Sequence, residues 1–250
     1  MKVDKLRTVI IYIIIILLGL VCLLPLLNIV AISFSSSAAV EGNMVGLIPV
    51  GFSTAAYKKI LEDSQFWHSF LISVERVVLT LIINFVLIVL MAYPLSKTNA
   101  QFRGRNIYAN LMIFAMLFNG GMIPTFLLVK SYGLLNTVWA LVLPGAVPIF
   151  NVILVMNFFA AVPKELEEAA FIDGANPLQV LTKIFIPISK PVLATVSLFS
   201  IVGSWNDFYS GLIYMSKAAY YPLMTYIQSL QINVEDLIKQ GNLSAVVDSA

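Results

Sequence analysis

The sequence has few of the residues that build metal, nucleophile and disulfide chemistry. Its 250 residues include one histidine, His68, and one cysteine, Cys22. A single cysteine excludes an internal disulfide, and one histidine with one cysteine falls short of the usual zinc ligand sets. No Gly-x-Ser-x-Gly nucleophile elbow occurs. We therefore expect no catalytic set, no metal and no cofactor in this chain. Cys22 is expected to face lipid or fill packing, and His68 to lie at the membrane interface beside Trp67.

Phosphate-binding motifs and charge are also scarce. The glycine-rich phosphate loop that ends in Gly-Lys-Ser/Thr is missing, so the chain is not expected to hydrolyse ATP itself. Only 11% of the residues are charged, and 15 basic against 13 acidic residues leave a net charge of +2. That balance does not favour a nucleic-acid partner. Any energy from ATP hydrolysis has to come from another protein.

Apolar residues, in contrast, make up 60% of the chain, more than a soluble domain of this size can bury. Crossing a bilayer takes about 20 mostly apolar residues in a helix, because backbone amides in lipid must bond within their own segment. Five segments meet this length: residues 9–34, 77–95, 107–129, 138–162 and 191–215. The first is too long for the core of a signal peptide, about 7–15 residues. The sequence predicts an all-α, polytopic transmembrane helix bundle.

Basic residues orient the predicted spans. With the N-terminus inside, nine of the 15 lysines and arginines fall in inner segments. These are Lys2, Lys5, Arg7, Lys97, Arg103, Arg105, Lys164, Lys183 and Lys190. The polar stretch 233–250 then lies outside. Proline and glycine within the spans are expected to kink the bundle: Pro25, Gly120, Gly121, Pro124, Pro144 and Pro148.

The inner segment 162–191 carries strong local signals. Pro163 suits a first helical turn, and three glutamates follow it near the positive end of the helix dipole. Gly174 favours a left-handed cap that stops the helix, and Asn176 with Pro177 favours an immediate second start. Pro187 is expected to end the second helix. The result is a compact helix–turn–helix hairpin to which another protein could bind.

This segment resembles the EAA loop of type I ATP-binding-cassette (ABC) importer permeases. The resemblance rests on Glu168-Ala169-Ala170, Asp173-Gly174-Ala175 and Ile186-Pro187. It implies that residues 165–183 dock in a cleft of a separate ATPase subunit, where ATP and Mg would be held. The implied coupling residues are Glu168, Ala169, Ala170, Asp173, Gly174, Ala175 and Pro187. The alternative is an ordinary amphipathic hairpin at the membrane surface.

Further segments resemble the carbohydrate-uptake permeases, in the polysaccharide or oligosaccharide branch related to the maltose-type permeases. They are NGGMIP at 119–124, residues 130–135, NFF at 157–159 and WND at 205–207. The resemblance implies a bacterial plasma-membrane protein with a cytoplasmic N-terminus, a second permease subunit and an extracytoplasmic solute-binding protein. Residues 1–65 would form an N-terminal helix with an outer segment, and residues 66–250 the permease core. Because the family's sixth helix is not found, we expect the core to be incomplete at its C-terminal end.

Polar residues within the spans are candidates for the substrate pathway. Sugar sites combine aromatic faces with amides and carboxylates, which favours Trp205, Asn206, Asp207 and Phe208, with Asn119, Asn151 and Asn157 as further candidates. Each could instead serve as an interhelical hydrogen bond. Glu75 and Arg76 are expected to be headgroup-level anchors rather than gating residues. Alternative functions are an ABC permease for another solute and an ion-coupled carrier, for which Asp207 is the one acid within a predicted span.

Overall fold

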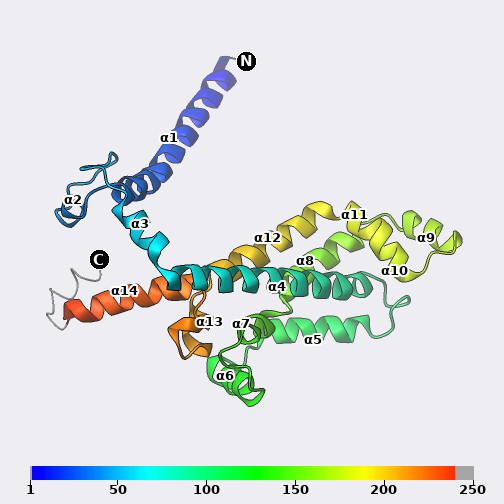
Figure 1. The fold of residues 1–250 in the computed structure, drawn as a ribbon. Helices are drawn as coiled ribbons and strands as arrows, with labels where there is room; N and C mark the ends of the chain where they lie inside the picture. Colours follow the sequence, from blue (N-terminus) through cyan, green and yellow to red (C-terminus); the bar gives the residue numbers. More distant parts are fainter. Residues whose placement is uncertain (1, 240–250) are drawn as a thin grey trace. The chain divides into compact units, whose positions relative to one another are not determined.

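The computed structural model describes residues 2–239, and its regular secondary structure in that range is helical throughout (Figure 1). The predicted all-α class is confirmed. The elements are α1 (Lys2–Ser33), α2 (Ser37–Glu41), α3 (Ala55–Glu62), α4 (Ser64–Leu95), α5 (Arg105–Leu117), α6 (Met122–Ser131), α7 (Val138–Val142), η1 (Leu143–Gly145), α8 (Ile149–Ala160), α9 (Lys164–Ile172), α10 (Pro177–Val180), the π-helical turn η2 (Leu181–Phe185), α11 (Ile186–Ile188), α12 (Lys190–Asn206), α13 (Tyr209–Tyr214), η3 (Ala218–Tyr220) and α14 (Leu223–Lys239). Most of the predicted polar end, residues 240–250, lies outside the described residues.

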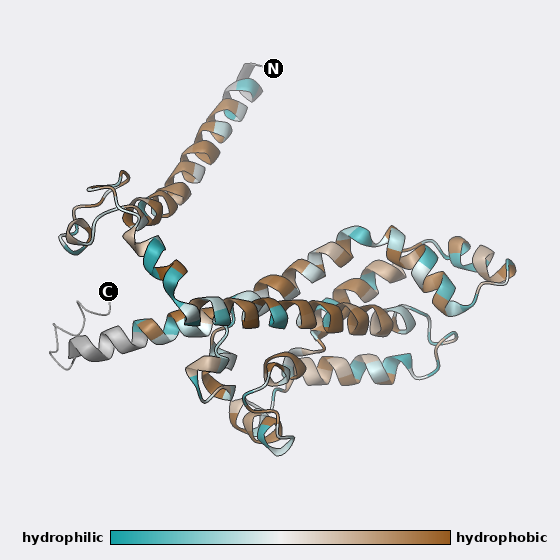
Figure 2. Ribbon diagram, in the orientation of Figure 1, coloured by the Kyte–Doolittle hydropathy of each residue, from teal (hydrophilic) through white to brown (hydrophobic). Residues whose placement is uncertain are grey.

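The chain divides into two compact units, one ending at Trp67 and the other starting at His68. The first unit consists of α1 to α3 and the first turn of α4. Apolar residues cover α1 on all sides (Figure 2), and Cys22 is exposed among them. The Asn28 amide donates to the carbonyls of Val45, at 3.3 Å, and Gly46, at 2.7 Å, which ties the segment after α1 to the end of that helix.

Membrane-spanning length is reached in two ways. Two helical stretches, Arg7–Ser33 and Ser64–Leu95, are long and apolar enough to cross a bilayer alone. Three pairs of shorter helices reach this length only when each pair is taken together. They are α5 with α6, bent by 110°, Val138–Gly145 with α8, bent by 48°, and Pro177–Ile188 with α12, bent by 84°. Counting each bent pair once gives up to five candidate spans within residues 2–239, in agreement with the five predicted.

Two of the breaks, at residues 118–121 and 146–148, fall where glycine and proline predict kinks, and two of the predicted spans need correction. The third predicted span is two helices, because Gly121 has a φ of +90° and its amide donates to the Asn119 side chain at 2.9 Å, forming a turn. The fifth predicted span ends at Asn206 and not at Met215. There Asp207 is extended and its carboxylate accepts the Ser210 amide at 3.1 Å, which starts α13. Pro25 lies inside α1, which continues to Ser33.

The main core of the second unit gathers α4, α8, η2 and α12. Ile88, Val155, Phe185 and Val196 are each at most 2% exposed within it. Because Phe185 belongs to the predicted coupling hairpin, one arm of that hairpin is built into the core. Many large apolar side chains elsewhere on these helices remain exposed, as a lipid-facing surface requires.

Candidate functional site

The first arm of the hairpin is α9, and the turn after it has the predicted glycine. Gly174 has a φ of +82°, in the left-handed region that favours glycine. Around it the Ala175 amide donates to the Ala170 carbonyl at 2.9 Å, and the Gly174 amide to the Phe171 carbonyl at 3.1 Å. Pro163 stands at the cap before α9 and not within its first turn. These short-range bonds fix a tight reversal of the chain.

The second arm begins at the predicted N-cap, Asn176, and the structure shows that this cap is reciprocal. The Asn176 side-chain oxygen accepts a hydrogen bond from the Gln179 backbone amide, and the Gln179 side-chain oxygen accepts one from the Asn176 backbone amide, each at 2.9 Å. Pro177 occupies the first helical position. Pro187 was expected to end this helix, and the helix ends one residue later: it passes through η2 and α11 to Ile188.

The turn of the hairpin presents an open, mixed surface. Four of the residues implied in coupling are exposed, namely Glu168, Ala169, Asp173 and Gly174, and Pro187 is exposed farther along. Ala170 and Ala175 are half-buried. A recess of about 520 Å³ lies at the turn, lined by Ala170, Asp173, Gly174, Ala175, Gln179, Val180, Lys183 and Ile184. The arrangement offers a small-residue concavity bordered by one acid and one base.

A second hollow, which we call the polar cavity, lies inside the second unit. It has a volume of about 290 Å³ and is lined by residues of α4, α7, η1, α8, α12 and α13. Arg76, Thr80 and Asn84 reach it from α4 at intervals of four residues, which places them on one face of that helix. Their exposures are 4%, 8% and 4%. Such polar groups within a span mark pathways or partners, because burying them is costly.

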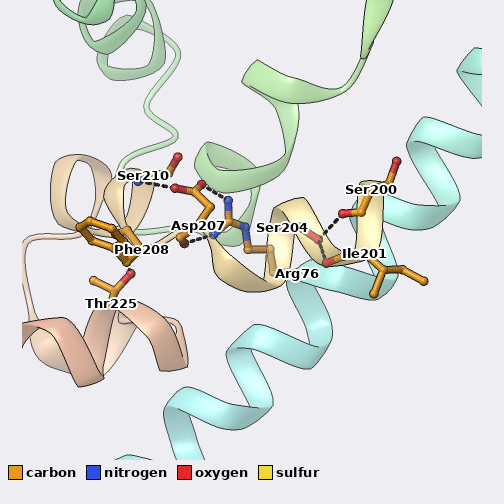
Figure 3. Close-up of polar contacts among 8 residues, drawn as sticks. All are labelled: Arg76, Ser200, Ile201, Ser204, Asp207, Phe208, Ser210 and Thr225. Atoms are coloured by element: carbon orange, nitrogen blue, oxygen red, sulfur yellow. Dashed lines mark hydrogen bonds and ion pairs between the residues drawn. The ribbon is translucent and has the colours of Figure 1, made fainter. Parts of the chain in front are cut away.

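Arg76 holds Asp207 at the break between α12 and α13 (Figure 3). Its guanidinium forms an ion pair with the Asp207 carboxylate and donates to the Asp207 carbonyl at 2.9 Å. Arg76 is therefore buried and paired, which corrects its prediction as an anchor with its tip in water. Glu75, its neighbour, is exposed. The pair neutralises both charges, so the cavity wall carries no net charge from them.

Three buried polar atoms on the cavity residues of α4 have no hydrogen-bond partner among the described residues. They are Arg76 Nε, Thr80 Oγ1 and Asn84 Oδ1. The other end of the Asn84 amide donates to Ser200 Oγ at 3.2 Å. Buried polar atoms normally find partners, so these three call for a polar occupant such as water or a hydroxyl-rich ligand. Together they offer one donor, one acceptor and one hydroxyl that does both.

The structure brings only two of the predicted pathway residues to this cavity, Asp207 and Asn151. The Trp205 ring packs edge-on against Phe70, with centroids 6.0 Å apart. Asn206 and Asn157 are exposed. Thr225 Oγ1 donates to the Phe208 carbonyl at 2.9 Å (Figure 3), and Asn119 belongs to the turn after α5. These five do not line the cavity.

Sequence reasoning missed the contribution of α4, although the sequence contains a signal for it. Five polar residues recur there at helical spacing within a mostly apolar helix, and all five are buried. They are Ser69, Ser73, Arg76, Thr80 and Asn84. A polar stripe of this kind predicts a face turned away from lipid.

Comparison with known proteins agrees with this architecture. The chain is 43% identical over 214 residues to Protein LplC of Bacillus subtilis (strain 168), covering 86% of this chain and 72% of the relative. It is 39% identical over 241 residues to the polygalacturonan/rhamnogalacturonan transport system permease protein YtcP of the same organism, covering 96% and 83%. A crystal structure of a bacterial ABC transporter involved in the import of the acidic polysaccharide alginate contains a chain with a TM-score of 0.85 and 34% identity, covering 92% of this chain and 81% of that one.

The sequence model of one protein family matches residues 82–246, about two thirds of the chain. Its members are described as inner membrane components of binding-protein-dependent transport systems. The matched region includes the hairpin and most of the elements around the polar cavity. This chain therefore belongs to the family of binding-protein-dependent transport system inner membrane components, and it is a transport subunit rather than an enzyme.

Proposed function

We propose that the chain is the permease subunit of an ABC importer for oligosaccharides and forms half of a translocation pathway with a second permease. The relatives at hand include a permease named for polygalacturonan and rhamnogalacturonan and an importer of alginate. Others are named for arabinooligosaccharides and for diacetylchitobiose. Because the first two names describe acidic polysaccharides, short uronic-acid oligosaccharides are the first substrates to test.

The observation that carries the proposal is the exposed hairpin, because it joins an open docking surface to a buried core. The recess at its turn is lined by Asp173 and Gly174, while Phe185 in its second arm is 2% exposed. An ATPase that gripped the turn would therefore pull directly on the packed helices. We place this hairpin and the N-terminus on the cytoplasmic side, and an extracytoplasmic solute-binding protein delivers the sugar on the other side.

The polar cavity has the chemistry to hold part of a sugar. Arg76 has an unpartnered donor, Asn84 an unpartnered acceptor and Thr80 an unpartnered hydroxyl. These groups can bond to neighbouring sugar hydroxyls, each of which both donates and accepts hydrogen bonds. Because Arg76 is already paired with Asp207, a sugar carboxylate would find no free positive charge there. The cavity would then bind hydroxyls, and Asn151 would add an amide to the same wall.

The test is uptake by the assembled complex in proteoliposomes, with labelled trigalacturonic acid and a neutral trisaccharide as probes. We expect uptake that requires ATP and the solute-binding protein and that survives collapse of the membrane potential. Uptake that disappears with the potential and ignores ATP would sink the proposal in favour of an ion-coupled carrier. ATP-dependent uptake of only a non-sugar solute would reject the carbohydrate assignment.

The cavity is tested in the same vesicles by the near-isosteric change Thr80→Val. It removes one unpartnered hydroxyl, so we expect uptake to fall about fivefold, the equivalent of about 1 kcal/mol for one hydrogen bond. The fold should not suffer, because no protein partner is lost. Thr195→Val is the matched control, since Thr195 is exposed on α12 and bonds only to the Pro191 carbonyl at 3.0 Å. Equal uptake by the two variants would show that the cavity is not part of the translocation pathway.

A further inference from the structure

A largely buried ion pair joins the segment just after α4 to the hairpin. Lys97 Nζ lies 2.7 Å from Glu167 Oε2, and the two side chains are 11% and 10% exposed. Lys97 follows α4 by two residues, and Glu167 lies in α9, the first arm of the hairpin. Breaking a buried pair by removing one partner costs far more than breaking an exposed one. This contact is therefore a firm attachment between two segments 70 residues apart.

Aromatic rings hold the same ammonium from two further sides. Lys97 Nζ lies 4.1 Å from the ring centroid of Tyr93, in the last turn of α4, and 4.1 Å from that of Phe185, in η2. Phe185 also packs edge-on against Phe159 of α8, with centroids 5.4 Å apart. One cation thus contacts α4 and both arms of the hairpin. Burial lowers the pKa of Lys97, and the carboxylate of Glu167 opposes that effect by favouring the charged form.

We propose that the Lys97–Glu167 pair is the positioning link that passes movement of the hairpin to α4 and, along α4, to the polar cavity. This inference rests on the proposed function, and it names the residues through which movement of the hairpin reaches the cavity. The helix α4 is continuous from Ser64 to Leu95, and Arg76 lies about 28 Å along it from Leu95, close to the thickness of the hydrocarbon core. One ion pair therefore lies just past the C-terminal end of α4, and the other lies within the same helix, about 28 Å back along it.

The competing route through α12 contains a joint. The helix that leaves the hairpin bends by 84° between Ile188 and Lys190 before α12 begins. A bend of that size next to η2 can absorb a displacement, because the hydrogen-bond pattern already changes there. The helix α4 has no such bend between assigned segments: its internal proline, Pro94, stands in the last turn, and the helix continues through it to Leu95. The geometry assigns the transmission of force to α4 and its lysine link.

The experiment measures solute taken up per ATP hydrolysed by the complete complex in proteoliposomes, together with the amount of ATPase that copurifies. Lys97→Met and Glu167→Gln should each lower this ratio at least tenfold while the ATPase stays bound. Lys97→Arg keeps the charge and should return the ratio to within about threefold of wild type. Lys58→Met is the matched control, because Lys58 and Glu62 form an exposed pair at 3.9 Å with side chains 78% and 69% exposed. It should leave the ratio unchanged.

The outcomes separate the link from a purely structural role. A structural role would reduce uptake and hydrolysis together, in proportion to the complex lost, and would overturn the inference, as would an unchanged ratio in both variants. Where Lys97→Met does not assemble, Glu167→Gln and the arginine rescue decide the question. The proposed function fails on a different reading, namely wild-type vesicles that take up no carbohydrate with ATP. The Lys97–Glu167 link is then tested by ATP hydrolysis alone. Hydrolysis by Lys97→Met and Glu167→Gln that no longer responds to the solute-binding protein supports the link, and an unchanged response overturns it.

Discussion

The hairpin and the polar cavity are built by opposite means. Hydrogen bonds that shape the hairpin join near neighbours, as between Asn176 and Gln179, three residues apart. The cavity depends on contacts such as Arg76 with Asp207, 131 residues apart. A docking element made of local contacts keeps its shape while it moves as a body. The cavity changes shape whenever the helices that carry its walls shift, which suits a site that opens and closes.

Removing the long-range ion pair should have the largest effect on stability. Arg76→Leu leaves the Asp207 carboxylate without its partner and should cost about 3 kcal/mol of unfolding free energy. The measurement is thermal unfolding of the purified chain in detergent, with Glu75→Gln as the neighbouring exposed control. The cavity would not depend on this pair if Arg76→Leu melted at the wild-type temperature.

Close backbone packing near the cavity gives the next largest effect. A Cβ atom at Gly211 would overlap the Thr225 side chain, so Gly211→Ala should cost about 2 kcal/mol through the displacement of α13 from α14. Gly203→Ala is the control, since its Cβ would meet nothing within 4 Å and alanine favours the helix α12. The same unfolding assay compares the two. Equal melting temperatures would mean that α13 and α14 do not meet this tightly.

Removing a short-range contact in the hairpin should have a smaller and more local effect on stability. Asn176→Ala removes the reciprocal cap of α10 and should cost about 1 kcal/mol within the hairpin. Hydrogen exchange should quicken at the amides of residues 178–180 and stay unchanged on α4. Faster exchange along α4 as well would show that the hairpin does not behave as a separate local unit.

The difference between short-range and long-range contacts explains which features the sequence could predict. Gly174 and Asn176 act within a few residues, so the turn and the second start of the hairpin followed from local chemistry. Apolar length likewise predicted up to five spans. The break at Asp207 and the burial of Arg76 could not be placed, because each exists through the other across 131 residues. Only the polar stripe on α4 pointed to them, and it shows which face is buried without showing the partner.

The hairpin turn is the proposed docking site for the ATPase. The direct measurement is site-specific crosslinking in native membranes, with Asp173→Cys in a Cys22→Ala background and Lys217→Cys as the control. Asp173 is exposed at the hairpin turn, and Lys217 is exposed just before η3. We expect an adduct between the cysteine at position 173 and an ATPase subunit, identified by mass spectrometry, and none from position 217. An ATPase adduct from position 217 alone, or none from position 173 in a complex that takes up sugar, would contradict it.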